Sequence, residues 1–111
     1  MNTCILSGRL EKNAVVKNTQ KVKVLSFVVE TIYGYNGEQK RDLVACVLFK
    51  PSPELEALLV GEGQGLYVEL EGRVSSSVSQ TQGERRFNSD VIVRGRTLAV
   101  QDHPEVSHGT A

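Results

Sequence analysis

Positively charged side chains lie among aromatic rings along much of the chain, and this combination is the clearest sign of chemistry in the sequence. Nucleobases stack on flat rings for about 1–3 kcal/mol each, while Lys and Arg side chains hold the phosphates of a single strand. The candidate stacking rings are Tyr33, Tyr35, Phe49 and Phe87. The candidate phosphate-binding cations are Lys21, Lys23, Lys40, Arg41, Lys50, Arg73, Arg85 and Arg86. An ordinary alternative stays open, because charged strand faces are usually solvated and Phe27, Phe49 or Phe87 could belong to a core.

The sequence contains no arrangement of side chains typical of an enzyme. Its only histidines, His103 and His108, fall in the C-terminal tail, so the folded part lacks the usual general base. Cys4 and Cys46 have neither C-x-x-C spacing nor histidine companions, which favours two small buried side chains over a metal site. We therefore expect a protein that is not an enzyme and that uses no metal or cofactor.

The charges are segregated along the chain even though the formal net charge is zero. Residues 1–50 hold eight Lys/Arg and four Asp/Glu, residues 51–72 hold five acids and no base, and residues 73–100 hold five Arg and two acids. Glu69 and Glu71 would share one face of a strand, where a solvated polar surface is a far more frequent outcome than a cation site. Two basic blocks thus flank an acidic block, and only the fold decides whether they share a surface.

Length and hydropathy limit the class of protein. A chain of 111 residues accommodates one domain. No apolar run approaches the roughly 18 residues that span a bilayer, and residues 1–5 lack the features of a secretion signal. Two cysteines are too few for a disulfide scaffold. We expect a cytoplasmic protein that makes no contact with membranes, and the single-strand binding suggested by the rings and cations would associate it with the nucleoid.

The local patterns predict an all-β fold with one short helix, since β-branched residues such as the 16 Val favour strands. A helix is expected after the N-cap Ser52, with Pro53 at its first position and an end at Gly61. The predicted order, β-β-β-α-β-β, is typical of the OB-fold, a five-stranded antiparallel Greek-key barrel with a helix between the third and fourth strands. Strands are expected at residues 3–10, 21–32, 41–50, 66–74 and 85–100, polar loops at 11–20 and 75–82, the barrel domain at 1–100, and a disordered tail at 101–111.

Finer signals within these segments concern faces, turns and bends. Alternation in the second strand predicts one buried face. The Asn-Gly pair at 36–37 predicts a tight hairpin, because both residues accept positive φ. Gly8 and Gly72 lie inside predicted strands, where glycine often marks a bend. The residues expected to face inward from the second strand are Leu25, Phe27 and Val29.

Four stretches, in matching order and spacing, resemble the bacterial-type single-stranded DNA-binding protein family. They read NTCILSGRL, VKVLSFVV, DLVACVLFK and LEGRV, at residues 2–10, 22–29, 42–50 and 70–74. Residues 83–93 are also similar to the closing hairpin of that family. The resemblance covers most of residues 2–100.

The resemblance implies an OB-fold that coats and protects single-stranded DNA in replication, recombination or repair, without strong sequence preference. It implies homotetramers or homodimers that pair through the edge of the first strand. By position, Phe49 takes the place of a stacking aromatic and Lys50 that of the cation following it. Tyr33, or Tyr35 beside it, takes a second stacking place.

The chain departs from the family pattern at several points. Leu43 stands where the family often has an aromatic residue, no ring lies near Val78 and Ser79, and the chain has no Trp. Family members usually end in a long flexible tail with an acidic, hydrophobic tip, whereas only eleven residues follow Val100 here. We therefore expect weaker or more electrostatic binding, and either a truncated tail or a tailless relative.

Three alternatives stay open from the sequence. The first is a protein like primosomal replication protein N, a tailless relative of the same fold that acts in replication restart mainly through protein contacts, or a specialised family member carried by a phage, plasmid or other mobile element. The second is a protein-interaction module in which the acidic stretch at 51–72 meets replication or restart proteins. The third is binding of single-stranded RNA, although nothing in the sequence obviously reads a 2′-hydroxyl.

Overall fold

The structure, a computed structural model, describes residues 1–19 and 21–101, without the side chains of Ser79, Thr81, Arg86 and Phe87. Most of this part is β-strand, and the helices it contains are too short or too polar to cross a membrane. The elements are β1 (Cys4–Leu10), β2 (Val15–Thr19), β3 (Val22–Tyr35), β4 (Glu38–Phe49), α1 (Pro53–Glu62), β5 (Tyr67–Thr81), β6 (Glu84–Val93), the 3₁₀ turn η1 (Gly95–Thr97) and β7 (Ala99–Gln101).

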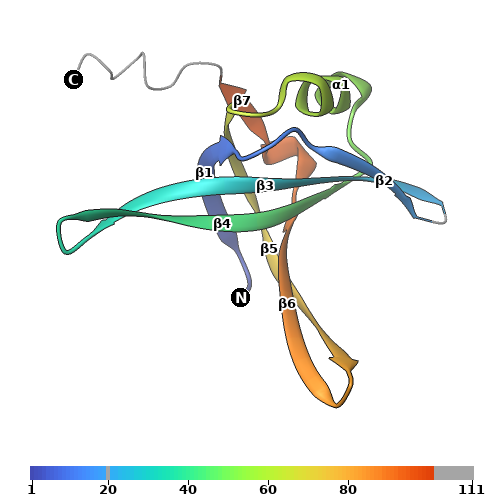
Figure 1. Cartoon of the computed structure of the whole chain (residues 1–111). Coiled ribbons are helices and arrows are strands. Elements are labelled where there is room, and N and C mark those ends of the chain that lie inside the picture. The colour runs from blue at the N-terminus through green and yellow to red at the C-terminus, as the bar shows by residue number, and fades with distance from the viewer. Residues whose placement is uncertain (20, 102–111) are drawn as a thin grey trace.

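Five strands, in the order β1-β3-β4-β6-β5, close into a barrel because β1 pairs with both β3 and β5. The contact between β4 and β6 is parallel and the other barrel contacts are antiparallel. Two long hairpins extend beyond the barrel in different directions (Figure 1): the β3–β4 arm (residues 30–43) and the β5–β6 arm (residues 75–90). With α1 between β4 and β5, this arrangement confirms the predicted OB-fold.

The core fills the barrel and is closed at one end by α1. Leu25, Phe27 and Val29 of β3 are all buried, which confirms the predicted inward face. Leu59 of α1 is fully buried in the same cluster, and its carbonyl accepts a hydrogen bond of 2.8 Å from the backbone N–H of Ala14. The helix therefore both covers the barrel end and holds the segment that leads into β2.

Two strand glycines allow the backbones to approach closely where the barrel closes. A Cβ at Gly8 would overlap the carbonyl of Glu30 in β3, and a Cβ at Gly72 would overlap the carbonyl of Ile92 in β6. β1 turns from β5 toward β3 at this point, since it pairs with β5 up to Arg9 and with β3 from Arg9 on. The close approach of neighbouring backbones is therefore the reason that each of these two strands carries a glycine inside it.

The helix begins as predicted and ends later than predicted. The Ser52 hydroxyl accepts a hydrogen bond of 3.2 Å from the Leu55 N–H, and Pro53 occupies the first turn. The expected stop at Gly61 is wrong, because α1 continues to Glu62 and its C-cap is Gly63. A side chain at Gly63 would overlap the carbonyl of Leu59, so the close packing at the helix end requires glycine there rather than at 61.

Two segments expected to be polar loops are strands. β2 falls in the predicted loop 11–20 and pairs with β3 from Val15 to Thr19. β5 runs through the predicted loop 75–82 and pairs with β6 up to the Thr81–Glu84 rung. Gln82 and Gly83 join β5 to β6 with positive φ angles, and the predicted Asn-Gly hairpin turn at 36–37 is confirmed by its own positive φ angles. Most side chains of both segments face solvent, although Ala14 and Val16 pack on the core, and the neighbouring strand satisfies the backbones.

The last predicted strand is interrupted. Residues 85–100 were expected to form one strand, but the chain leaves β6 after Val93 and returns through η1 to β7. The hydroxyl of Thr97 donates to the Glu71 carbonyl at 3.1 Å and accepts from the Glu71 N–H at 3.0 Å, which fixes the turn against β5. β7 then pairs with β5. Apart from Gln101, the predicted tail lies outside the described residues.

Candidate nucleic-acid interface

Phe49 lies on the outside of the barrel, near the end of β4. Leu48 beside it faces the core, and since side chains alternate along a strand, Phe49 points outward. Its ring is 47% exposed, whereas Phe27 on the inner face is only 3% exposed. The structure thus places Phe27 in the core and leaves Phe49 available for stacking.

Two apolar side chains extend this outer surface along the β3–β4 arm. Ile32 pairs with Arg41, and on the neighbouring rung of the same face Glu30 pairs with Leu43. Ile32 and Leu43 are both exposed, at 57% and 47%. These four residues form a square in which the apolar pair lies on one diagonal and the Arg41–Glu30 pair on the other.

Arg73 joins the same surface from the far side of the sheet. Ser26 of β3 pairs with Val47 of β4, Val47 with Ile92 of β6, and Ile92 with Arg73 of β5. Residues that are paired across strands point to the same side. Seven residues that lie exposed or half-buried on this side are called the outer face below: Ile32, Arg41, Leu43, Val47, Phe49, Arg73 and Ile92.

The two predicted tyrosines lie on the opposite side of the β3–β4 arm. Tyr33 pairs with Lys40 and Tyr35 with Glu38, in alternation with the outer-face rungs. Tyr33 is 46% exposed and Tyr35 is 63% exposed, so both rings are accessible. A shallow hollow of about 440 Å³ lies on the arm beside Tyr33 and Glu38. The predicted stacking rings are therefore divided between two faces.

Three predicted cations gather at the other end of the β3–β4 pair, near α1. Lys50 follows β4 with a positive φ of 55°, and its N–H donates to the Lys23 carbonyl at 3.0 Å. Lys21 lies in the turn before β3 and is exposed. About ten strand residues, roughly 33 Å at 3.3 Å each, separate Lys23 from Tyr33. The predicted residues thus line a long track and do not converge on a pocket.

The β5–β6 arm carries the remaining predicted residues. Arg85 is exposed near the tip of the arm, where it pairs in register with Gln80. Arg86 and Phe87 belong to β6, but their side chains lie outside the described residues. Val78 is exposed, and although no ring lies near it in the sequence, it pairs in register with Phe87 of β6.

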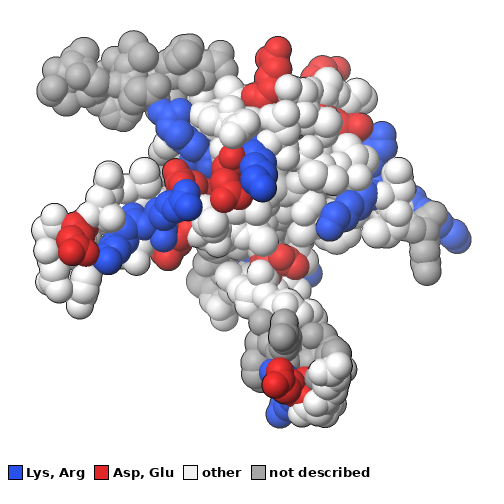
Figure 2. Space-filling view, viewed as in Figure 1, with Lys and Arg blue, Asp and Glu red and all other residues white. Residues whose placement is uncertain are grey.

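Several cations on β3 and β4 are paired with carboxylates. Arg41 Nη1 lies 2.6 Å from Glu30 Oε2, and this hydrogen bond raises the pKa of Arg41 above its usual value. Lys40 Nζ lies 3.0 Å from Glu38 Oε2 on the opposite side of the arm. Figure 2 shows the result along this arm, where basic and acidic side chains lie next to one another. The surface is therefore mixed in charge, not uniformly basic.

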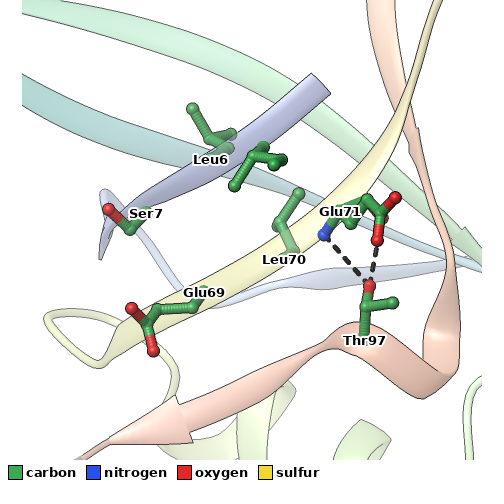
Figure 3. Close-up of a pocket in the computed structure, with 7 residues that line it drawn as sticks. Leu6, Ser7, Glu69, Leu70, Glu71 and Thr97 are labelled. Carbon is green, nitrogen blue, oxygen red and sulfur yellow. Dashed lines mark hydrogen bonds between the residues drawn. The ribbon is translucent and has the colours of Figure 1, made fainter. Parts of the chain in front are cut away.

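The acids of β5 line a shallow depression with no sign of a cation site. Ser7, Glu69, Glu71 and Thr97 surround a space of about 300 Å³ (Figure 3). Gln101 Nε2 donates to Glu69 at 3.2 Å, and Arg94 lies 3.9 Å from Glu71. Within residues 1–19 and 21–101, no group of three or more His, Cys, Asp or Glu side chains is placed to hold a metal ion.

The family model named "Single-strand binding protein family" matches residues 1–101. The chain belongs to this family. Among solved structures, this family member is similar to the Plasmodium falciparum SSB complex with ssDNA, with a TM-score of 0.71 and 16% sequence identity. The alignment covers 90% of this chain and 92% of that chain, and it supports the same fold. A comparison with curated proteins found no match.

Sequence reasoning about this single-strand binding family member missed two features of the interface. The first is the exposed Ile32, which strand alternation past Val29 would have placed on the outer face beside Leu43, a position that the family resemblance had already singled out. The second is the ion pairing of predicted cations. The Glu38–Lys40 pair was detectable from its two-residue spacing, whereas the Arg41–Glu30 pair depends on the register between β3 and β4.

Proposed function

We propose that this member of the single-strand binding protein family binds single-stranded DNA along its outer face and protects exposed strands during replication, recombination or repair. The half-exposed ring of Phe49 carries the proposal, since it shares this surface with the exposed Ile32 and Leu43. Rings and apolar side chains contact the faces of bases, which all nucleotides offer, while Arg41 and Arg73 hold phosphates. Such binding reads little sequence and requires no catalysis.

A titration of fluorescent oligo-dT at several salt concentrations tests this proposal. Affinity is expected to fall steeply with salt, because each phosphate contact releases counterions from the DNA. Arg73→Gln should weaken binding on all sequences and reduce the salt slope by about one. Lys12→Gln, an exposed cation outside the outer face, is the matched control. A flat salt response, or an equal effect of both variants, contradicts the proposal.

The choice between DNA and RNA requires a separate competition experiment. Stacking and phosphate contacts work on either nucleic acid, and the 2′-hydroxyl is the group that distinguishes them. We expect unlabelled oligo-dT to displace labelled oligo-dT better than oligo-rU of the same length. Stronger displacement by oligo-rU would identify RNA as the ligand.

Self-association through β1 is the second part of the proposal. Residues 4–7 of β1 pair with β5 on one side, and no described strand pairs with them on the other. Ile5 on this edge is 82% exposed, and an uncovered strand edge can pair with a second copy. Light scattering should give a dimer or tetramer, and Ile5→Asp should reduce the mass, whereas Val15→Asp on the edge strand β2 should not. A monomeric mass for the unchanged protein contradicts this part.

The protein-interaction alternative has less support among the described residues. The acids of residues 51–72 are spread over α1 and β5, and several have partners within the chain. Glu56 contacts Lys23 at 3.1 Å, Glu69 accepts from Gln101, and Glu71 lies near Arg94. An acidic docking surface would instead present its carboxylates together. Contacts with replication or restart proteins thus stay a prediction of the family resemblance.

A further inference from the structure

Three cations predicted to hold phosphates already have carboxylate partners within the chain. Arg41 is paired with Glu30 at 2.6 Å, Lys40 with Glu38 at 3.0 Å, and Lys23 with Glu56 at 3.1 Å. The three pairs are distributed over both sides of the β3–β4 arm and over the contact between β3 and α1. Ion pairing is thus a recurrent feature of the predicted phosphate-binding cations, of which Arg41 belongs to the outer face and Lys40 and Lys23 lie outside it.

In two of these pairs the carboxylate is the more buried partner, whereas in the Lys40–Glu38 pair it is the more exposed one. The side chain of Glu30 is 22% exposed while that of Arg41 is 59% exposed, and Glu56 is likewise more buried than Lys23. Glu30 and Glu56 are held by the surrounding structure, and Arg41 and Lys23 lie over them toward solvent. A cation in this position can turn from the carboxylate to a phosphate without a change in the backbone.

A carboxylate and a phosphate compete for the same N–H donors. Both are anionic oxygen acceptors that form short, charge-assisted bonds with Arg and Lys. When a phosphate takes the donor, the carboxylate loses its partner and stays close to a second negative group. Each acid therefore reduces the net gain from the phosphate contact by about the strength of an exposed ion pair, which corresponds to a two- to fivefold change in affinity.

We propose that Glu30, Glu38 and Glu56 are internal competitors of the DNA phosphates, which keep affinity below the level that the cations alone would give and so favour release. The inference rests on the proposed function and extends it, because it requires the bound strand to contact Lys40 and Lys23 beside the outer face as well as Arg41 on it. The three acids are also part of the acidic complement that brings the formal net charge of this family member to zero.

Charge-neutral variants of the full chain test this inference. Glu30→Gln and Glu38→Gln should each tighten binding to labelled oligo-dT two- to fivefold at 50 mM salt. The gain should shrink at 300 mM salt, since salt screens exposed ion pairs. Glu62→Gln at the end of α1 makes the same change in net charge away from both arms, and it should alter affinity less than 1.5-fold. Thermal melting verifies that each variant is folded.

A double-variant comparison separates direct competition from a general effect of charge. In an Arg41→Gln background, Glu30→Gln should give no gain, because the donor for which it competes is absent. The inference is overturned if Glu30→Gln and Glu38→Gln do not tighten binding, if Glu62→Gln tightens it equally, or if the Glu30→Gln gain persists without Arg41.

The same set of variants distinguishes the failure of this inference from that of the proposed interface. If Arg41→Gln and Lys40→Gln weaken binding but the acid variants have no effect, the interface stands and the competition does not exist. If neither the cation nor the acid variants change affinity, the arm does not contact DNA, and both proposals fail. Glu38 lies at the exposed tip of the hairpin, so its variant supports the test even if Glu30→Gln unfolds.

Discussion

Replacement of Phe49 tests whether its ring serves binding or packing. The ring is half-exposed on the outer face, so Phe49→Ala removes both a proposed stacking surface and part of the barrel packing. Phe49→Leu keeps most of the apolar volume but removes the flat ring. Phe27→Ala, in the core on the same strand pair, is the matched control for a ring that only packs.

The expected magnitudes follow from the exposure of each ring. A fully buried aromatic side chain removes about 150–250 Å² from water, so a ring 47% exposed contributes about 2–3 kcal/mol at about 25 cal/mol per Å². Alanine retains part of this, which leaves a loss of about 1–2 kcal/mol for Phe49→Ala. Phe27→Ala should cost about 3–5 kcal/mol. Loss of one stacked base, about 1–3 kcal/mol, weakens binding about five- to 150-fold.

Thermal melting and an oligo-dT titration on each variant give the two readouts. Phe49→Ala should lower the melting temperature by about 5–15 °C and weaken binding at least fivefold. Phe49→Leu should recover most of the stability and little of the affinity. The stacking role is refuted if Phe49→Ala binds as tightly as the unchanged protein. It is also refuted if Phe49→Leu restores affinity and stability together.

Three further predictions concern the barrel. Gly72→Ala should lower the free energy of unfolding by about 1–3 kcal/mol, because the added Cβ would overlap the β6 backbone. At the control position Gly34, an added Cβ would have one neighbouring atom, at 4.0 Å, so Gly34→Ala should leave the denaturation midpoint unchanged or raised. Asn2→Ala should lower the free energy of unfolding by about 1 kcal/mol in urea, because the Asn2 side chain makes hydrogen bonds of 2.7 and 2.9 Å to the β5 backbone. An unchanged free energy of unfolding would show that water replaces these bonds equally well. Burial raises the pKa of the Cys46 thiol from 9.0 to about 12. Because the thiol therefore loses its proton at a lower pH in the unfolded state than in the folded state, the free energy of unfolding should fall as the pH rises between these two values. The stability of the Cys46→Ala variant should fall less steeply over that pH window. Identical pH profiles for the two proteins would contradict the burial of the Cys46 thiol.

Much of the barrel was predictable because its signals are local. Alternation identified the buried face of β3, and the glycines at 8 and 72 marked the tight crossings. Ser52 fixed the start of α1 through a hydrogen bond to a residue three positions away. These features depend on the conformations and partners of neighbouring residues, which the sequence specifies directly.

The errors arose where a partner strand, not local composition, decides the structure. Residues 75–81 are polar and were expected to be a loop, yet they form a strand because β6 satisfies their backbone. The helix passes Gly61 because packing of Leu59 against the barrel outweighs the roughly 1 kcal/mol that a helical glycine costs. Local propensity is a weak term in both cases, and tertiary contacts override it.

The sequence by itself determined the chemical character of this protein: cations among rings, no catalytic constellation, and the strand and turn pattern of an OB-fold. Only the tertiary structure decided how that chemistry is presented. It exposed Phe49 and buried Phe27, divided the tyrosines from the outer face, and joined Arg41 to Glu30 across two strands. The physical reason is register: the order of residues sets what each side chain can do, and the pairing of distant strands sets which side chains meet.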